Sequence, residues 1–186
     1  NATGFERGHS IVTNALPHAG KDVVIRLDLV DFFASTPAER VNRYFRFIGY
    51  DPEAADLLTR LCTHKGVLPQ GSPTSPRLSN LVNYRLDARL VALADRRGLS
   101  YTRYADDITF SGSVVGMRPT MRVNPKTLET FPREFSRVND VVRAAKRIIE
   151  DEGYRLHMHR KLRVYRRRHR QLVTGLVVND KPDLPR

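Results

Sequence analysis

The chain has 186 residues and carries 32 Lys or Arg against 20 Asp or Glu, which gives a formal net charge of +12 at pH 7. Its 40% hydrophobic content excludes a wholly disordered polycation, and its length suits one domain with a hydrophobic core. The single cysteine, Cys62, excludes an internal disulfide and cannot form a zinc site alone. A folded domain this basic most often faces a polyanion, and nucleic acid is the first candidate.

The sequence also carries no signal for a membrane or for export. Its apolar runs are too short for a membrane-spanning helix, and residues 1–10 lack the hydrophobic core of a secretory signal. We therefore expect a cytoplasmic protein with no membrane partner.

The first half of the chain predicts one buried strand, two helices and a loop. The β-branched run at residues 23–28 follows a Gly-Lys-Asp turn and predicts the strand. Residues 36–48 predict a helix, because Thr-Pro stands at the start, apolar residues follow at helical spacing and a glycine comes next. A second helix is expected over residues 53–64, and two Gly and three Pro predict a loop over residues 66–76.

The second half predicts a long helix, two strands joined by a tight turn, another helix and a last strand. The long helix should run from residue 76 to 97, and its apolar stripe consists of Leu78, Val82, Leu86, Leu90 and Leu93. The other elements are expected at residues 101–104, 108–110, 135–149 and 172–178, with a surface insertion at residues 113–133.

These elements predict a fold class. Without the two middle helices and their loop, the order is strand, helix, strand, strand, helix, strand. This is the split β-α-β (ferredoxin-like) pattern, an α+β fold in which helices cover one face of an antiparallel sheet. No second core is visible, so residues 1–186 are expected to form one domain.

Three carboxylates stand at strand ends in this fold. Asp28 ends the first strand, and Asp106 and Asp107 occupy the turn of the hairpin. The first and third strands are central neighbours in a split β-α-β sheet, so the three side chains could converge. Close carboxylates repel one another unless cations neutralise them, and Mg²⁺ favours oxygen ligands of this kind. The alternative is an ordinary acidic surface turn, which is common.

Five short motifs occur in order along the chain. They are Asn14-Ala15-Leu16-Pro17-His18, Arg26-Leu27-Asp28-Leu29-Val30-Asp31-Phe32-Phe33, Leu68-Pro69-Gln70-Gly71-Ser72-Pro73-Thr74-Ser75-Pro76, Tyr104-Ala105-Asp106-Asp107 and Val173-Thr174-Gly175. Together they resemble bacterial retron-type reverse transcriptases, with their NAxxH, first palm, loop-to-helix, YxDD and VTG motifs. The resemblance implies a reverse-transcriptase palm with part of the fingers, and it implies that the N-terminal fingers and the thumb are missing from this chain.

The resemblance also implies a two-metal site for nucleotidyl transfer. Asp28 and Asp106 would be the direct metal ligands, Asp107 would support the same site, and the backbone carbonyl of Leu29 would be an additional ligand. Two Mg²⁺ ions are expected, with Mn²⁺ as a possible substitute. Such a pair can activate a primer 3′-hydroxyl and stabilise the leaving oxygen of pyrophosphate.

The resemblance implies roles for further residues around the dNTP. Phe33 would be an aromatic gate that excludes a 2′-hydroxyl, although core packing is the alternative. Gln70 and Gly71 would lie beneath the nucleotide, where Gly allows close backbone approach. Lys161 would protonate the departing pyrophosphate, and Arg160 is the other candidate for that motif position.

Two regions are expected to contact RNA. By the resemblance, the first comprises Asn14, His18, Val173, Thr174 and Gly175. The second is the basic stretch at residues 155–170, and within it Arg166, Arg167 and Arg168 are the candidate phosphate contacts. Tyr154 immediately precedes this stretch, Tyr165 lies within it, and both could stack on bases. The alternative is an ordinary solvated basic face.

The function that these residues imply is RNA-directed DNA synthesis on a structured template-primer RNA, through an RNA–DNA hybrid, with dNTPs as substrates. The resemblance further implies RNA-linked single-stranded DNA as product, a role in antiphage defence and a possible toxin or effector partner. One alternative is a non-polymerising RNA-binding scaffold with the same fold. The other is a different palm-fold nucleotidyl enzyme, such as a cyclase.

Overall fold

The computed structural model describes residues 2–113, 121–123, 130–132, 134–157 and 162–185. The helices are α1 (Ile11–Ala15), the 3-10 helix η1 (Leu16–His18), α2 (Ala38–Phe47), α3 (Pro52–Cys62), α4 (Ser75–Val82), α5 (Tyr84–Arg97) and α6 (Glu134–Asp151). The strands are β1 (Val23–Asp28), β2 (Ser100–Tyr104), β3 (Asp107–Gly112), β4 (Met121–Val123), β5 (Thr130–Pro132), β6 (Arg163–Arg166), β7 (Leu172–Val173) and β8 (Leu176–Val177).

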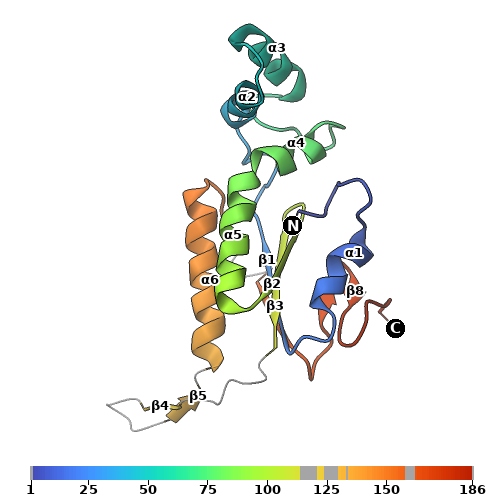
Figure 1. The fold of residues 1–186 in the computed structure, drawn as a ribbon, viewed down its shortest axis with the longest axis vertical. Coiled ribbons are helices and arrows are strands. Elements are labelled where there is room, and N and C mark those ends of the chain that lie inside the picture. The colour runs from blue at the N-terminus through green and yellow to red at the C-terminus, as the bar shows by residue number, and fades with distance from the viewer. Residues whose placement is uncertain (1, 114–120, 124–129, 133, 158–161, 186) are drawn as a thin grey trace.

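A four-stranded sheet in the order β2-β3-β1-β6 forms the centre of the fold. β1 pairs antiparallel with both β3 and β6, so the first and third strands are central neighbours, as the split β-α-β pattern predicts. Helices α5 and α6 lie together on one side of this sheet, and α2, α3 and α4 form the far end of the molecule (Figure 1). The predicted α+β architecture is confirmed.

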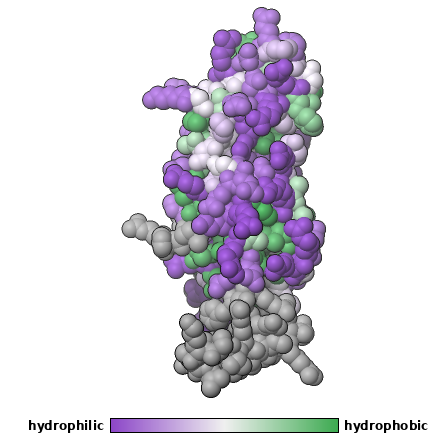
Figure 2. Space-filling view, turned by 90° about the vertical axis from the view of Figure 1, so that its left-hand side faces the viewer, coloured by the Kyte–Doolittle hydropathy of each residue, from purple (hydrophilic) through white to green (hydrophobic). Residues whose placement is uncertain are grey.

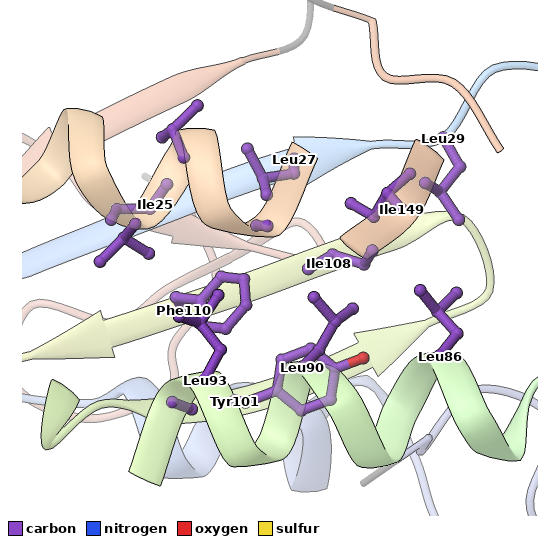
Figure 3. Close-up of a cluster of buried hydrophobic side chains, with 14 of the residues drawn as sticks. Ile25, Leu27, Leu29, Leu86, Leu90, Leu93, Tyr101, Ile108, Phe110 and Ile149 are labelled. Atoms are coloured by element: carbon purple, nitrogen blue, oxygen red, sulfur yellow. The ribbon is translucent and has the colours of Figure 1, made fainter. Parts of the chain in front are cut away.

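The alternation of side chains along β1 builds a core on each face of the sheet. Ile25 and Leu27 point toward α5 and α6 and pack in one cluster with Leu86 and Leu90 (Figure 3). Val24 points to the opposite face, where it packs with residues of α1 and of the β7–β8 hairpin. Each fully buried aliphatic side chain contributes about 2 kcal/mol of transfer free energy, so both faces stabilise the sheet.

The fourth strand of the sheet is not the one predicted. It is Arg163–Arg166, whereas residues 172–178 form the separate β7–β8 hairpin. In β6, Tyr165 lies opposite Val24 and packs against its cluster, which supplies the apolar contact of an edge strand. The flanking arginines conceal this strand in the sequence, because a run of cations predicts a solvated segment rather than a strand.

The predicted long helix is two helices, because the chain leaves helical geometry at Asn83, with φ −103° and ψ 17°. The buried Asn83 amide accepts from Arg40 Nη1 at 2.9 Å and from Tyr154 Oη at 3.0 Å, and it donates to the Ser79 carbonyl at 2.8 Å. The break divides the predicted apolar stripe: Leu78 and Val82 pack among α2, α3 and α4, whereas the later leucines pack on the sheet.

The surface is mostly polar on the side that Figure 2 presents, with small scattered hydrophobic areas. Within the predicted insertion at residues 113–133, β4 and β5 form an antiparallel pair apart from the central sheet. Among the helices that the structure describes, none combines the length and the apolar composition needed to cross a bilayer.

Candidate active site

The β2–β3 hairpin holds Asp106 in its tight turn, beside the end of β1, whereas Asp107, also expected in the turn, is the first residue of β3. Ala105 has a φ of +56°, which lets the chain reverse in this turn. The Leu29 N–H donates to the Asp106 carbonyl at 3.1 Å, and Asp28 lies opposite Asp107 in the β1–β3 register. Opposite positions of an antiparallel pair share one face. The structure therefore brings Asp28 and Asp107 onto one face and ties Asp106 to the residue that follows Asp28.

Each of the two β-strand carboxylates has a cationic or imidazole neighbour. Arg26 Nη2 donates to both oxygens of Asp107 at 2.9 Å. Burial alone would lower the pKa of Arg26, but the charge of Asp107 and the hydrogen bonds to it outweigh burial and raise that pKa. His157 donates its backbone N–H to the Asp28 carbonyl at 2.9 Å, and its Nε2 lies 3.8 Å from Asp28 Oδ2. Arg26 thus compensates one negative charge of the acidic group.

The donor set fits a divalent cation that also binds substrate. Among the residues that the structure describes, no group of three His, Cys, Asp or Glu side chains forms a ready metal cage. Asp28 and Asp106 nevertheless both carry hard carboxylate oxygens, and the backbone of Asp106 is hydrogen-bonded to Leu29, the residue that follows Asp28. Mg²⁺ typically binds through one or two carboxylates together with substrate phosphates and water, so two protein carboxylates suffice. Asp107, paired with Arg26, is less suited to direct coordination.

A buried ion pair between Arg103 and Asp87 is hydrogen-bonded to the β2–β3 turn. Arg103 in β2 is 0% exposed, and its Nε and Nη2 donate to the Asp87 carboxylate at 2.8 and 2.6 Å. Its Nη1 donates to the Ala105 carbonyl within the turn at 3.1 Å, and the Tyr101 hydroxyl donates to Asp87 at 2.7 Å. Burial would lower the pKa of Arg103, but the hydrogen bonds and charge of Asp87 raise it. The short sequence motifs do not include Arg103 or Asp87, so they do not predict this ion pair. The signal that could have predicted it is the presence of an arginine inside an otherwise buried strand.

The residues expected at the dNTP occupy the junction between the sheet and helices α2–α4. Phe33 is half-buried, packs against the clusters on both sides of this junction, and has Phe32 at a ring-centroid distance of 5.4 Å. Gln70 and Gly71 lie in the exposed turn before α4, where Gly71 has a φ of +86°. Lys161 and Arg160 lie outside the described residues.

The NAxxH and VTG motifs meet, but mostly inside the protein. Asn14 Nδ2 donates to the Thr174 hydroxyl at 3.4 Å, and the same hydroxyl donates to the Ile11 carbonyl at 3.3 Å. His18 is fully buried, with its ring nitrogens 2.7 Å from the Ser111 hydroxyl and 2.8 Å from the Thr102 hydroxyl.

This burial corrects the expectation that every residue of the two motifs touches RNA. Asn14, His18 and Val173 are buried, so none of them presents an exposed side chain for direct RNA contact in this structure. Asn14 bonds Thr174 of the β7–β8 hairpin and Val173 packs in the cluster with Val24, whereas His18 bonds the hydroxyls of β2 and β3. Thr174 is partly exposed and Gly175 exposed, at the turn of the hairpin.

The basic stretch is partly built into the sheet. Arg166 is the last residue of β6 and is half-buried, whereas Arg167 and Arg168 follow it and are exposed. Arg167 Nη2 lies 3.4 Å from an Asp180 oxygen in a solvent-exposed ion pair, which is weak at moderate salt.

Neither of the two tyrosines of this region is a fully exposed surface residue. Tyr154 is buried, and its hydroxyl lies 2.7 Å from Thr36 Oγ1 and 3.0 Å from Asn83 Oδ1, so its expected stacking on bases is wrong. Tyr165 is half-buried against the cluster around Val24.

An antiparallel sheet backed by two helices, with carboxylates at the end of β1 and in the β2–β3 turn, defines a polymerase-type palm. The sequence profile of the family "Reverse transcriptase (RNA-dependent DNA polymerase)" matches residues 1–149. The chain belongs to this reverse transcriptase family, and it is similar to several curated retron reverse transcriptases.

Three relatives illustrate the match. The chain is 42% identical to the retron Mx162 reverse transcriptase of Myxococcus xanthus over 96% of its length, and 40% identical to the retron Ec86 reverse transcriptase of Escherichia coli over 73%. It is 38% identical to the retron Mx65 reverse transcriptase of Myxococcus xanthus over its whole length. The chain spans 38%, 42% and 43% of these three relatives, respectively.

Proposed function

We propose that the chain is the palm and part of the fingers of a retron-type reverse transcriptase, and that it extends a primer on structured RNA with dNTPs. The observation that carries this proposal is the position of Asp28 beside the Asp106 turn, fixed by the Leu29–Asp106 hydrogen bond and the β1–β3 register. Membership of the reverse transcriptase family supports it.

In this mechanism Asp28 and Asp106 bind the divalent ions, with Mg²⁺ as the proposed cation and Mn²⁺ as a substitute. When bound, such ions would supply activation of the primer 3′-hydroxyl and stabilisation of the charge that develops on the leaving pyrophosphate. The backbone of Leu29 offers a further oxygen. Arg26 neutralises Asp107, and this lowers the repulsion that a third close carboxylate would exert on the two ligands.

The remaining residues position the substrates. Phe33 lies at the junction of sheet and fingers and excludes a 2′-hydroxyl by its bulk, while Gln70 and Gly71 support the nucleotide from the exposed turn before α4. Lys161 is proposed, from the motif match alone, to protonate pyrophosphate. Much of the rate enhancement then comes from positioning and electrostatics.

The RNA interface is proposed to include the end of β6 and the tip of the β7–β8 hairpin. Arg166, Arg167 and Arg168 supply cations for phosphates, and Thr174 and Gly175 present the exposed part of the VTG element. By its kinship with retron enzymes, the product is RNA-linked single-stranded DNA made for antiphage defence, with a toxin or effector protein as a further partner.

Product analysis tests this function. The chain is incubated with an RNA template, an annealed primer, four dNTPs and Mg²⁺, and the products are separated by size and by charge. A ladder of extended primer that is absent with Asp28→Asn supports the polymerase. A cyclic nucleotide as the product would replace it with a cyclase, and tight RNA binding without any nucleotide product would replace it with a scaffold.

A further inference from the structure

The N-terminal residues 2–6 form a strap along the active-site hairpin. Ala2 forms a parallel bridge with Arg103, and the Thr3 N–H donates to the Arg103 carbonyl at 2.9 Å. Gly4 lies so close to the turn that a Cβ built on it would be 2.7 Å from the Ala105 nitrogen. Only glycine therefore fits beside this turn without a shift of the backbone.

Helix α4 holds the same strap from the other side. Asn80 Nδ2 donates to the Gly4 carbonyl at 2.7 Å and to Glu6 Oε1 at 2.9 Å. Arg77 forms an ion pair with Glu6 as well. The strap thus bridges the hairpin of the palm and the first helix after the Gln70–Gly71 turn.

Phe5 occupies the middle of the strap and has a left-handed backbone conformation. Its φ is +63°, a left-handed value that is costly for a bulky residue, and such outliers concentrate at functional sites. Its ring lies 6.3 Å from the ring of Phe33 and 6.0 Å from that of Tyr104, between centroids. Nevertheless, 45% of the residue is exposed to solvent. A strained backbone therefore places a partly exposed aromatic ring beside the turn that carries Asp106.

We propose that Phe5 is a positioning residue for nucleotide selection, which holds the Phe33 ring in place and completes the apolar wall between Phe33 and Tyr104. This inference rests on the proposed function, because the occupant of the wall is the sugar of an incoming dNTP. Phe5 acts through Phe33: with its neighbour ring fixed, Phe33 keeps the position in which it excludes a 2′-hydroxyl. The left-handed backbone conformation at residue 5 directs the ring toward Phe33 and Tyr104.

The test measures nucleotide binding without chemistry. The chain is bound to an RNA template whose primer ends in a dideoxynucleotide, and the affinities for dATP and ATP are measured with Mg²⁺. The variants are Phe5→Ala and Phe5→Gly, and both remove the ring. Only Phe5→Gly also relieves the backbone strain, because glycine adopts the left-handed conformation readily. Phe47→Ala is the control, because Phe47 is an exposed aromatic residue on α2. Thermal melting confirms that each variant is folded.

We expect both Phe5 variants to lower the ratio of dATP affinity to ATP affinity by about threefold to tenfold, the range of one aromatic contact. Phe47→Ala should leave the ratio unchanged. Phe5→Tyr, which keeps an aromatic ring, should also have the wild-type ratio. An unchanged ratio in a folded Phe5→Gly chain overturns the inference, even if the wild type extends primers. Conversely, a lowered ratio in a chain that never extends a primer supports the inference and overturns the proposed polymerisation.

Discussion

Asp87→Asn should destabilise the protein, because it removes the negative charge that neutralises Arg103 while preserving the side-chain shape and an acceptor for the Tyr101 hydroxyl. Arg103 is fully buried, and its two hydrogen bonds to Asp87 are 2.6 and 2.8 Å long. Removing one partner of a buried pair costs about 3–5 kcal/mol, since the remaining charge is left uncompensated. Small domains are stable by about 5–15 kcal/mol, so this is a large fraction of the total.

Urea unfolding followed by circular dichroism measures the effect. With a slope of about 2 kcal/mol per M, the midpoint should fall by roughly 1.5–2.5 M. The matched control is Glu39→Gln, which removes an exposed pair with Arg43 one helical turn away and should cost about 0.3–0.5 kcal/mol. A midpoint for Asp87→Asn that matches the control would refute the reasoning, because it would mean that Arg103 is solvated without Asp87.

The double variant Arg103→Met with Asp87→Asn separates stability from function. It leaves no buried charge, so most of the lost stability should return. However, it also lacks the hydrogen bond from Arg103 Nη1 to the Ala105 carbonyl, which holds the turn that carries Asp106. We expect this variant to unfold near the wild-type midpoint and to extend primers more slowly than the wild type. Full activity in the double variant would mean that the turn needs no support from Arg103.

Three further predictions follow from the same geometry. Burial, with a smaller effect of the Lys21 charge, lowers the pKa of His18 from 6.5 to about 4. Because the folded protein favours the neutral His18 ring, the free energy of unfolding should be highest above pH 6.5 and fall by about 3 kcal/mol as the pH drops toward 4. Urea unfolding as a function of pH checks this, and the fall should be smaller in His18→Gln than in the wild type. Neutralising Arg166, Arg167 and Arg168 should flatten the salt dependence of RNA binding by about 0.7–0.9 in log–log slope per lost phosphate contact, and an unchanged slope would make them a solvated face. Gly4→Ala should lower the free energy of unfolding by about 1–3 kcal/mol and slow primer extension, because its Cβ would press on the Ala105 nitrogen.

The sequence predicts the central part of the fold because the pattern there is local. A β-branched run defines β1, two short apolar segments define the hairpin strands, and the strand order places Asp28 next to the turn. The strand β6 could not be predicted in this way, because Arg163 and Arg166 conceal one apolar contact in an edge strand. The break at Asn83 also depends on distant partners, Arg40 and Tyr154, rather than on a proline or glycine.

The candidate site shows the same division between local motif and distant contact. Short motifs identify the carboxylates, but they do not show that Arg103 and Asp87 form a buried pair under the turn or that Phe5 reaches Phe33. The motifs also misplace residues whose hydroxyl and amide partners lie far along the chain. His18 was expected at an RNA surface, yet its ring is enclosed by hydroxyls of β2 and β3.

The most direct measurement of the central claim is RNA-templated primer extension by the wild-type chain, Asp106→Asn and Glu39→Gln, with Mg²⁺ and all four dNTPs. Both substitutions turn one carboxylate into an amide, but Asp106 lies in the turn tied to Leu29, whereas Glu39 is exposed on α2. The account predicts equal extension by the wild type and Glu39→Gln and none by Asp106→Asn. Extension by Asp106→Asn at the wild-type rate would contradict it, and so would the absence of extension in a wild-type chain that binds the template.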